Sequence, residues 1–186
     1  MLRFLLLTFC FILYSSVAVS AVKHTLSETT GLSKWDVEGQ GFSLSFAQLG
    51  ADYVKAVFIA RGLPTEVAEN VSTYCVFGTT ITNTSDTGLT SELSNWRIVT
   101  RDGVEHKLKL KSEWVKEWIS KGVKFRWLLL SNQQNFDEGD WIQGFTTVAL
   151  KPGSRFDLHY SWKQQGKLFN QTIKGMHCAP AKTSTQ

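Results

Sequence analysis

The segment between His106 and Trp127 combines basic and tryptophan side chains in a pattern that could bind an anionic partner. Seven of its residues are basic and two are acidic. Cations beside amphipathic tryptophan rings are suited to anionic lipid headgroups or to an acidic polysaccharide. The candidate binding residues are Lys107, Lys109, Lys111, Trp114, Trp118 and Trp127.

The same segment also has a structural interpretation, which the pattern favours. The three lysines from Lys107 to Lys111 alternate with leucines, as on the exposed face of a strand, where lysine also blocks edge-to-edge pairing. Trp114 and Trp118 are one helical turn apart and could pack a helix against the rest of the domain. Their role as binding residues therefore depends on which way the helix faces.

Other residues with catalytic or metal-binding chemistry are isolated. His177 lies between Met176 and Cys178, a soft set that would suit copper, but a disulfide at Cys178 would remove the thiolate. Glu138 and Asp140 could perform acid–base chemistry or hold a cation, although their Gly-containing segment is typical of a turn. The chain has no Gly-x-Ser-x-Gly nucleophile motif. We therefore expect no catalytic residue, no metal and no cofactor.

The first 21 residues have the pattern of a secretory signal peptide. Arg3 precedes an apolar run from Phe4 to Val19, and the small residue Ala21 ends a plausible cleavage site. The run is short for a membrane span. We expect cleavage after Ala21, no span in the mature chain, and a periplasmic or secreted location.

The cysteines agree with export. Cys10 would leave with the signal peptide, and Cys75 and Cys178 would remain. An even number of cysteines in an oxidising compartment favours a disulfide between them. Two free thiols, or a bridge to a partner, are the alternatives.

Helical signals come before strand signals along the chain. Residues 22–43 are polar and lack periodicity, which predicts a loose N-terminal arm. Apolar residues at helical spacing predict a helix from about residue 44 that ends before Gly62 and Pro64. A second short helix is predicted from Glu66 to Tyr74, so the helix pair spans residues 44–74.

From Cys75 onward the hydrophobic period is two, which predicts strands. The predicted strands are 75–83, 96–100, 104–110, 123–130, 141–150, 155–162 and 168–174. Hairpins are predicted at Asp102-Gly103 and around Pro152-Gly153, and one short helix at 112–121. The prediction is a mostly β chain with one domain at 44–178, in which an antiparallel sandwich of about seven strands over 75–178 follows the helix pair. A disordered tail is expected at 179–186.

Four short motifs occur between residues 75 and 175. They are a polar turn after Ile81, the hairpin at Asp102-Gly103, the run Phe136-Asp-Glu-Gly-Asp followed by Gly144, and Lys151-Pro-Gly followed by Phe156-Asp-Leu. Together they resemble the immunoglobulin-like, telokin-like domains of exported bacterial proteins. The resemblance implies a binding or structural module and a bacterial source, and it transfers no catalytic residue.

The overall charge excludes a dedicated nucleic-acid binder, because the net charge of +4 falls by one when Arg3 is removed with the signal. The leading hypothesis is an exported, non-catalytic binding or accessory module with a protein partner in the envelope or outside the cell. A binder of carbohydrate or anionic cell-surface glycan is the first alternative, and a small secreted hydrolase using Glu138 or Asp140 is the second. Three N-glycosylation sequons, at Asn70, Asn83 and Asn170, matter only in a eukaryotic secretory pathway.

Overall fold

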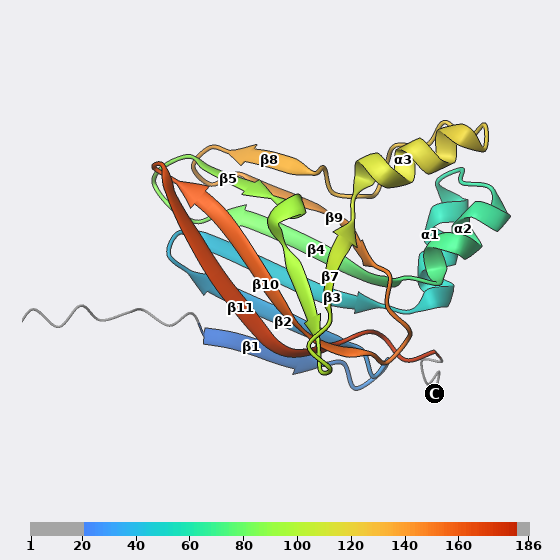
Figure 1. The fold of residues 1–186 in the computed structure, drawn as a ribbon, viewed down its shortest axis with the longest axis horizontal. Coiled ribbons are helices and arrows are strands. Elements are labelled where there is room, and N and C mark those ends of the chain that lie inside the picture. The colour runs from blue at the N-terminus through green and yellow to red at the C-terminus, as the bar shows by residue number, and fades with distance from the viewer. Residues whose placement is uncertain (1–20, 182–186) are drawn as a thin grey trace, which may run out of the picture.

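The protein is described by a computed structural model that covers residues 21–181 (Figure 1). The predicted signal peptide up to Ser20, and the predicted tail from residue 182, lie outside the described residues. The described chain is mostly β, with eleven strands in one sheet and three α-helices. All pairings between these strands are antiparallel.

The strands are numbered in chain order and the helices lie between them. The strands are β1 (Ala21–Leu26), β2 (Ser33–Gly39), β3 (Phe42–Leu49), β4 (Cys75–Asn83), β5 (Leu89–Glu92), β6 (Arg97–Thr100), β7 (Glu105–Lys109), β8 (Gln133–Phe136), β9 (Trp141–Val148), β10 (Arg155–Gln164) and β11 (Lys167–His177). The helices are α1 (Ala51–Ala60), α2 (Thr65–Ser72) and α3 (Lys111–Ser120).

The sheet folds over so that its two halves face each other across the main core (Figure 1). The neighbour order is β1-β2-β3-β4-β9-β7-β6-β10-β5-β8, with β11 also paired to β10. Phe42 of β3 stacks on Trp162 of β10 at 4.5 Å between ring centroids. Phe77 of β4 meets Phe156 of β10 edge-on at 5.9 Å. Aromatic pairs between the two halves thus join strands that are distant in the sheet order.

Local signals placed several elements correctly. The strand predicted at 75–83 is β4, and the hairpin at Asp102-Gly103 joins β6 to β7, with Gly103 at φ +79°. In β10 the alternate residues from Phe156 to Trp162 are buried, as the period-two pattern predicts. The helix predicted at 112–121 is α3.

The N-terminal part of the prediction is wrong. The loose arm expected at 22–43 contains β1, β2 and the start of β3. The helix expected from residue 44 begins only at Ala51, because Phe42, Leu44 and Phe46 alternate with small polar residues and point into the core of the sheet. The helix pair, α1 and α2, therefore lies between β3 and β4 and does not precede the sheet.

One strand prediction and one hairpin prediction also fail. Residues 123–130 form no strand, since Leu128 adopts φ +69° and only Leu129 makes a single bridge, to Phe145. The segments at 141–150 and 155–162 are strands, but they do not form a hairpin. β9 pairs with β4 and β7, whereas β10 pairs with β11, β6 and β5, so the chain crosses between the two halves of the sheet. Eleven strands replace the seven expected.

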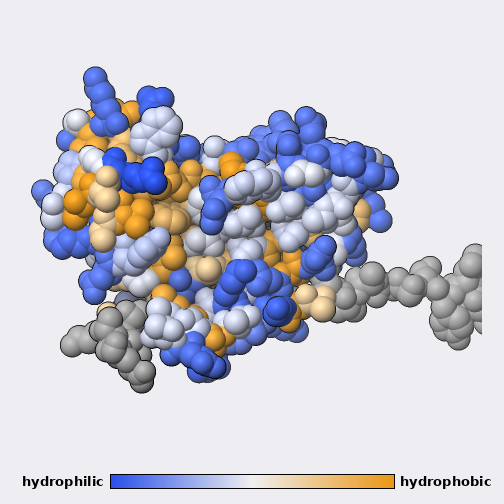
Figure 2. Space-filling view, turned by 180° about the vertical axis from the view of Figure 1, so that it is seen from behind, coloured by the Kyte–Doolittle hydropathy of each residue, from blue (hydrophilic) through white to orange (hydrophobic). Residues whose placement is uncertain are grey.

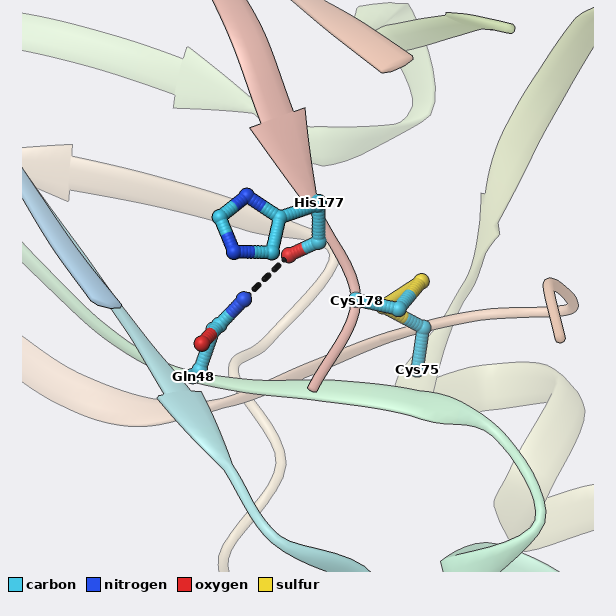
Figure 3. Close-up of a disulfide and its surroundings, with 4 residues drawn as sticks. All are labelled: Gln48, Cys75, His177 and Cys178. Carbon is cyan, nitrogen blue, oxygen red and sulfur yellow. Dashed lines mark hydrogen bonds between the residues drawn. A yellow bond between two sulfur atoms is a disulfide. The ribbon is translucent and has the colours of Figure 1, made fainter. Parts of the chain in front are cut away.

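The predicted disulfide between Cys75 and Cys178 is present and joins the start of β4 to the residue after β11 (Figure 3). Beside it, the buried side chain of Gln48 accepts a hydrogen bond from the Ser33 backbone N–H at 2.7 Å. The same side chain donates to the backbone carbonyl of His177 at 2.7 Å (Figure 3). Strands β2, β3 and β11 are therefore tied together next to the covalent link.

The three helices form a second core at one end of the sheet (Figure 1). Phe58 of α1 lies against Trp118 of α3 at 6.3 Å and against Phe125 at 5.9 Å between ring centroids. Within residues 21–181, no helix has the length and apolar character needed to cross a membrane. The disulfide fits an oxidising compartment.

Candidate functional site

Lys109 is held in place by the groups around it. Its ammonium group donates to a Glu117 carboxylate oxygen at 2.6 Å and to the Tyr74 hydroxyl at 3.2 Å, and it lies 3.5 Å from the centroid of the Trp114 ring. Donation by Lys109, more than any other cause, holds the pKa of the Glu117 carboxyl below its ordinary value. Lys109 is thus a structural cation that links β7 to α3 and to Tyr74 in the connection between α2 and β4, rather than a free binding group.

Trp114 and Trp118 are both buried, which agrees with the packing role that the pattern of the segment favoured. Trp114 donates its indole N–H to the Thr147 hydroxyl at 2.8 Å and stacks on Trp118 at 5.6 Å. Trp118 in turn contacts Phe125 edge-on. The helix faces inward because these two large rings, one turn apart, provide the apolar stripe that α3 needs for packing.

Lys107 and Lys111 remain at or near the surface, but the fold does not gather them with the other cations of the segment. Lys107 is exposed on β7, opposite Arg97 of β6. Lys111 is the first residue of α3 and is partly buried. Lys116 lies within α3, and the remaining cations follow its C-terminal end. Because Trp114 and Trp118 are buried and Lys109 is paired, the six predicted binding residues do not form one surface.

A different surface forms beyond the C-terminal end of α3. Its exposed residues, which we call the helical tip, are Ile119, Lys124, Arg126 and Trp127. The side chain of Ile119 is 52% exposed and that of Trp127 is 70% exposed. Neither Lys124 nor Arg126 has a carboxylate within ion-pair distance among residues 21–181.

The shape of this tip follows from local sequence. Gly122, at φ +76°, ends α3, and the Val123 backbone N–H returns to the Trp118 carbonyl at 2.8 Å. The chain then runs without regular structure, and Phe125 turns inward onto the second core while its neighbours Lys124 and Arg126 turn outward. Trp127, two residues further on, remains exposed.

A hollow of about 300 Å³ lies within the helical tip. It is lined by Ile119, Gly122, Lys124, Phe125 and Arg126. Seen from behind, apolar side chains gather at the helical end of the molecule beside strongly hydrophilic ones (Figure 2). The tip therefore offers an apolar recess with two cations at its rim. Of its four residues, only Trp127 was among the predicted binding residues.

A second set of hollows lies on the outer surface of β10 and β11. One, of about 470 Å³, is lined by Asn95, His159, Tyr160, Ser161, Asn170, Gln171 and Thr172. Another, of about 240 Å³, adjoins it and includes Lys163 and Leu168. His159 shares a hydrogen bond of 2.8 Å with the Thr172 hydroxyl, and this pair lacks a carboxylate partner in the hollow. The lining residues of this hollow offer hydrogen-bond donors and acceptors to a ligand.

The other predicted chemical residues have structural surroundings. Cys178 is in the disulfide, so its thiolate cannot join His177 as a metal ligand. Burial, with the charges of Arg155 and His24, lowers the pKa of His177. The Asp140 carboxylate accepts the Asp137 backbone N–H at 2.9 Å, as in a turn. In the described part of the chain, no three His, Cys, Asp or Glu side chains are grouped closely enough to hold a metal ion.

Comparison with known proteins adds no family to this description. No family model matches the chain, and no curated protein matches it in sequence.

Proposed function

We propose that this chain is an exported, non-catalytic binding module that acts on a macromolecule or surface of the cell envelope or the extracellular space. In this proposal the curved sheet is an immunoglobulin-like sandwich related to telokin-like domains, with α1 and α2 inserted between β3 and β4. Residues 1–21 are its signal peptide, and the mature protein is periplasmic or secreted. The disulfide and the pattern of the first 21 residues support export.

The helical tip carries the proposal. Ile119 and Trp127 expose apolar surface that water solvates poorly, and they adjoin cations without carboxylate partners among the described residues. An acidic partner surface would cover the apolar groups and pair with Lys124 and Arg126. The tip therefore favours a partner that presents acidic groups next to apolar ones.

A pair of matched variants tests this proposal. Ile119→Asp with Lys124→Glu alters the tip, and Leu168→Asp with Lys163→Glu makes the same change on the β10–β11 surface, where Leu168 is 51% exposed. The tagged mature protein is cross-linked in its native envelope or medium, and the recovered material is identified by mass spectrometry. We expect the first variant to lose the specific adduct and the second to keep it. Loss of the adduct only in Leu168→Asp with Lys163→Glu would contradict the proposal. A defined turnover of a substrate by the protein would also contradict it.

Glycan binding is a second candidate, supported by the exposure of two of the four tryptophans that could serve it. Trp127 is 70% exposed and Trp141 is 65% exposed, whereas Trp114 and Trp118 are buried. Amide side chains in the hollow of about 470 Å³ would supply hydrogen bonds to sugar hydroxyls. Under this alternative, Trp127→Ala and Trp141→Ala would each weaken retention on cell-surface polysaccharide.

A further inference from the structure

The helical tip has features that distinguish a bilayer surface from a folded acidic protein as its partner. Its two exposed apolar residues are Ile119, which is 52% exposed and lines the recess, and Trp127, which is 70% exposed and directly follows Arg126 of the same recess. Tryptophan is enriched at the boundary between headgroups and acyl chains, where one side of the ring is apolar and the other is wet. An exposed Trp and an exposed aliphatic side chain are suited to shallow insertion.

The cations of the tip are placed to meet headgroups when those side chains insert. Lys124 and Arg126 line the same recess as Ile119 and Phe125, so their charges lie at the rim of the apolar surface. The carboxylates on α3 are already occupied. Glu117 binds Lys109 and Lys121, and Glu113 accepts the Leu110 backbone N–H at 2.7 Å. The tip is therefore complementary to negative charge. The charged groups of long basic side chains can stay at the interface while their aliphatic carbons cover apolar surface.

We propose that the helical tip binds the surface of an anionic phospholipid bilayer, with Trp127 and Ile119 inserted between headgroups and Lys124 and Arg126 paired with lipid phosphates. The apolar recess of about 300 Å³ accepts part of an acyl chain or glycerol backbone. This inference rests on the proposed function, because it names the partner of the same surface. An acidic protein or polysaccharide at the tip is an outcome that the test distinguishes.

Vesicle flotation measures this binding directly. The oxidised mature protein is mixed with vesicles of phosphatidylcholine alone, or of phosphatidylcholine with 30 mol% phosphatidylglycerol. We expect flotation with the anionic vesicles only, and a marked loss of it in high salt. Lys124→Ala with Arg126→Ala should weaken the affinity about thirtyfold, since each basic residue near an anionic surface contributes about 1 kcal/mol. The control, Lys163→Ala with Lys174→Ala, removes two exposed cations elsewhere and should leave flotation unchanged.

Quenching by brominated lipid tests the insertion of the tryptophan ring. Trp127→Phe should remove most of the quenching seen with anionic vesicles, and Trp141→Phe should retain it. Trp141 is a matched control because it is 65% exposed and pairs with Thr82, near the opposite end of β4 from the helices. Near-ultraviolet circular dichroism confirms that each variant is folded.

Three results would overturn the inference. The first is failure of the folded protein to float with anionic vesicles, and the second is equal flotation with neutral vesicles. The third is flotation that survives both Lys124→Ala with Arg126→Ala and Trp127→Phe. Suppose that the protein does not bind vesicles, but Ile119→Asp with Lys124→Glu loses a protein or polysaccharide adduct in the native envelope. The inference then fails and the proposed function stands. If neither vesicles nor an adduct depend on the tip, both fail.

Discussion

The ammonium group of Lys109 lies over the face of the Trp114 ring, 3.5 Å from its centroid, while it donates to Glu117. A cation that is held against an aromatic face and a carboxylate contributes to stability rather than to recognition. Lys109→Met should therefore lower the free energy of unfolding by about 1–3 kcal/mol. Urea unfolding followed by tryptophan emission measures the change. Lys107→Met, on the same strand but exposed, should have almost no effect, and equal effects of the two substitutions would contradict this role.

The Lys109–Glu117 pair also predicts an acid-dependent loss of stability. The pKa of Glu117 is lowered in the folded protein, first by the hydrogen bond from Lys109, so the folded state binds this proton less readily than the unfolded state. Its stabilising contribution is present above the ordinary carboxyl pKa and is lost as the pH falls through the lowered one. Urea midpoints measured between neutral and acidic pH should fall less steeply in Glu117→Gln than in the natural protein. Parallel curves would show that Glu117 is not a source of the pH dependence.

The disulfide should contribute much of the stability of the fold. It links residues 103 positions apart, and the loop-entropy model gives at most about 4–5 kcal/mol for a link of this length. Cys75→Ser with Cys178→Ser should lower the melting temperature strongly, and a reductant should lower that of the natural protein but not that of the variant. A melting temperature unaffected by the reductant in the natural protein would exclude this contribution.

Gly144 should tolerate no side chain. A Cβ added there would lie 2.9 Å from the Leu128 carbonyl oxygen and 2.9 Å from Leu130, where residues 128–130 lie along β9. Gly144→Ala should therefore destabilise the protein by about 1–3 kcal/mol, as overpacking does. Gly78→Ala in the neighbouring strand is the matched control, because its nearest contact would be an ordinary 3.8 Å. A smaller effect at Gly144 than at Gly78 would contradict the described path of residues 128–130.

The three N-glycosylation sequons should differ in use when the chain passes through a eukaryotic secretory host. The Asn83 side chain is buried and donates to the carbonyls of Thr87 and Asp137 at 2.7 and 2.9 Å. Asn170 is exposed on β11. Peptide mass spectrometry should find glycan at Asn170 and none at Asn83, and Thr172→Ala should remove the former. Glycan at Asn83 would require that this part of the chain is modified before it folds.

Elements with strong local signals could be predicted from the sequence. The Asp102-Gly103 turn, the alternation in β10 and the helix ended by Gly122 each depend on neighbouring residues, and each is present. β3 was missed because Phe46 and Leu49 also continue the helical stripe of Tyr53, so one apolar pattern fitted two structures. The Gln165-Gly166 turn of the β10–β11 hairpin, with both residues at positive φ, is a further element that depends on neighbouring residues.

The order of the strands could not be read from local patterns. Nothing near Pro152-Gly153 distinguishes a hairpin from a crossing between the two halves of the sheet, since the choice is made by distant pairings with β4 and β11. The same limit applies to the site. Whether Trp114 faces solvent depends on Thr147 and Lys109, which only the fold brings beside it. The sequence therefore predicts that the segment is basic and rich in tryptophan. It does not predict which of its residues reach the surface.

Site-specific photo-cross-linking tests the central claim most directly. A photoreactive amino acid replaces Ile119 in the tip or Leu168 on the β10–β11 surface, two positions with nearly equal exposure of 52% and 51%. The protein is illuminated in its native envelope or medium. We predict a specific adduct from position 119 and none from position 168. An adduct from position 168 alone, or from neither position, would contradict a binding function of the helical tip.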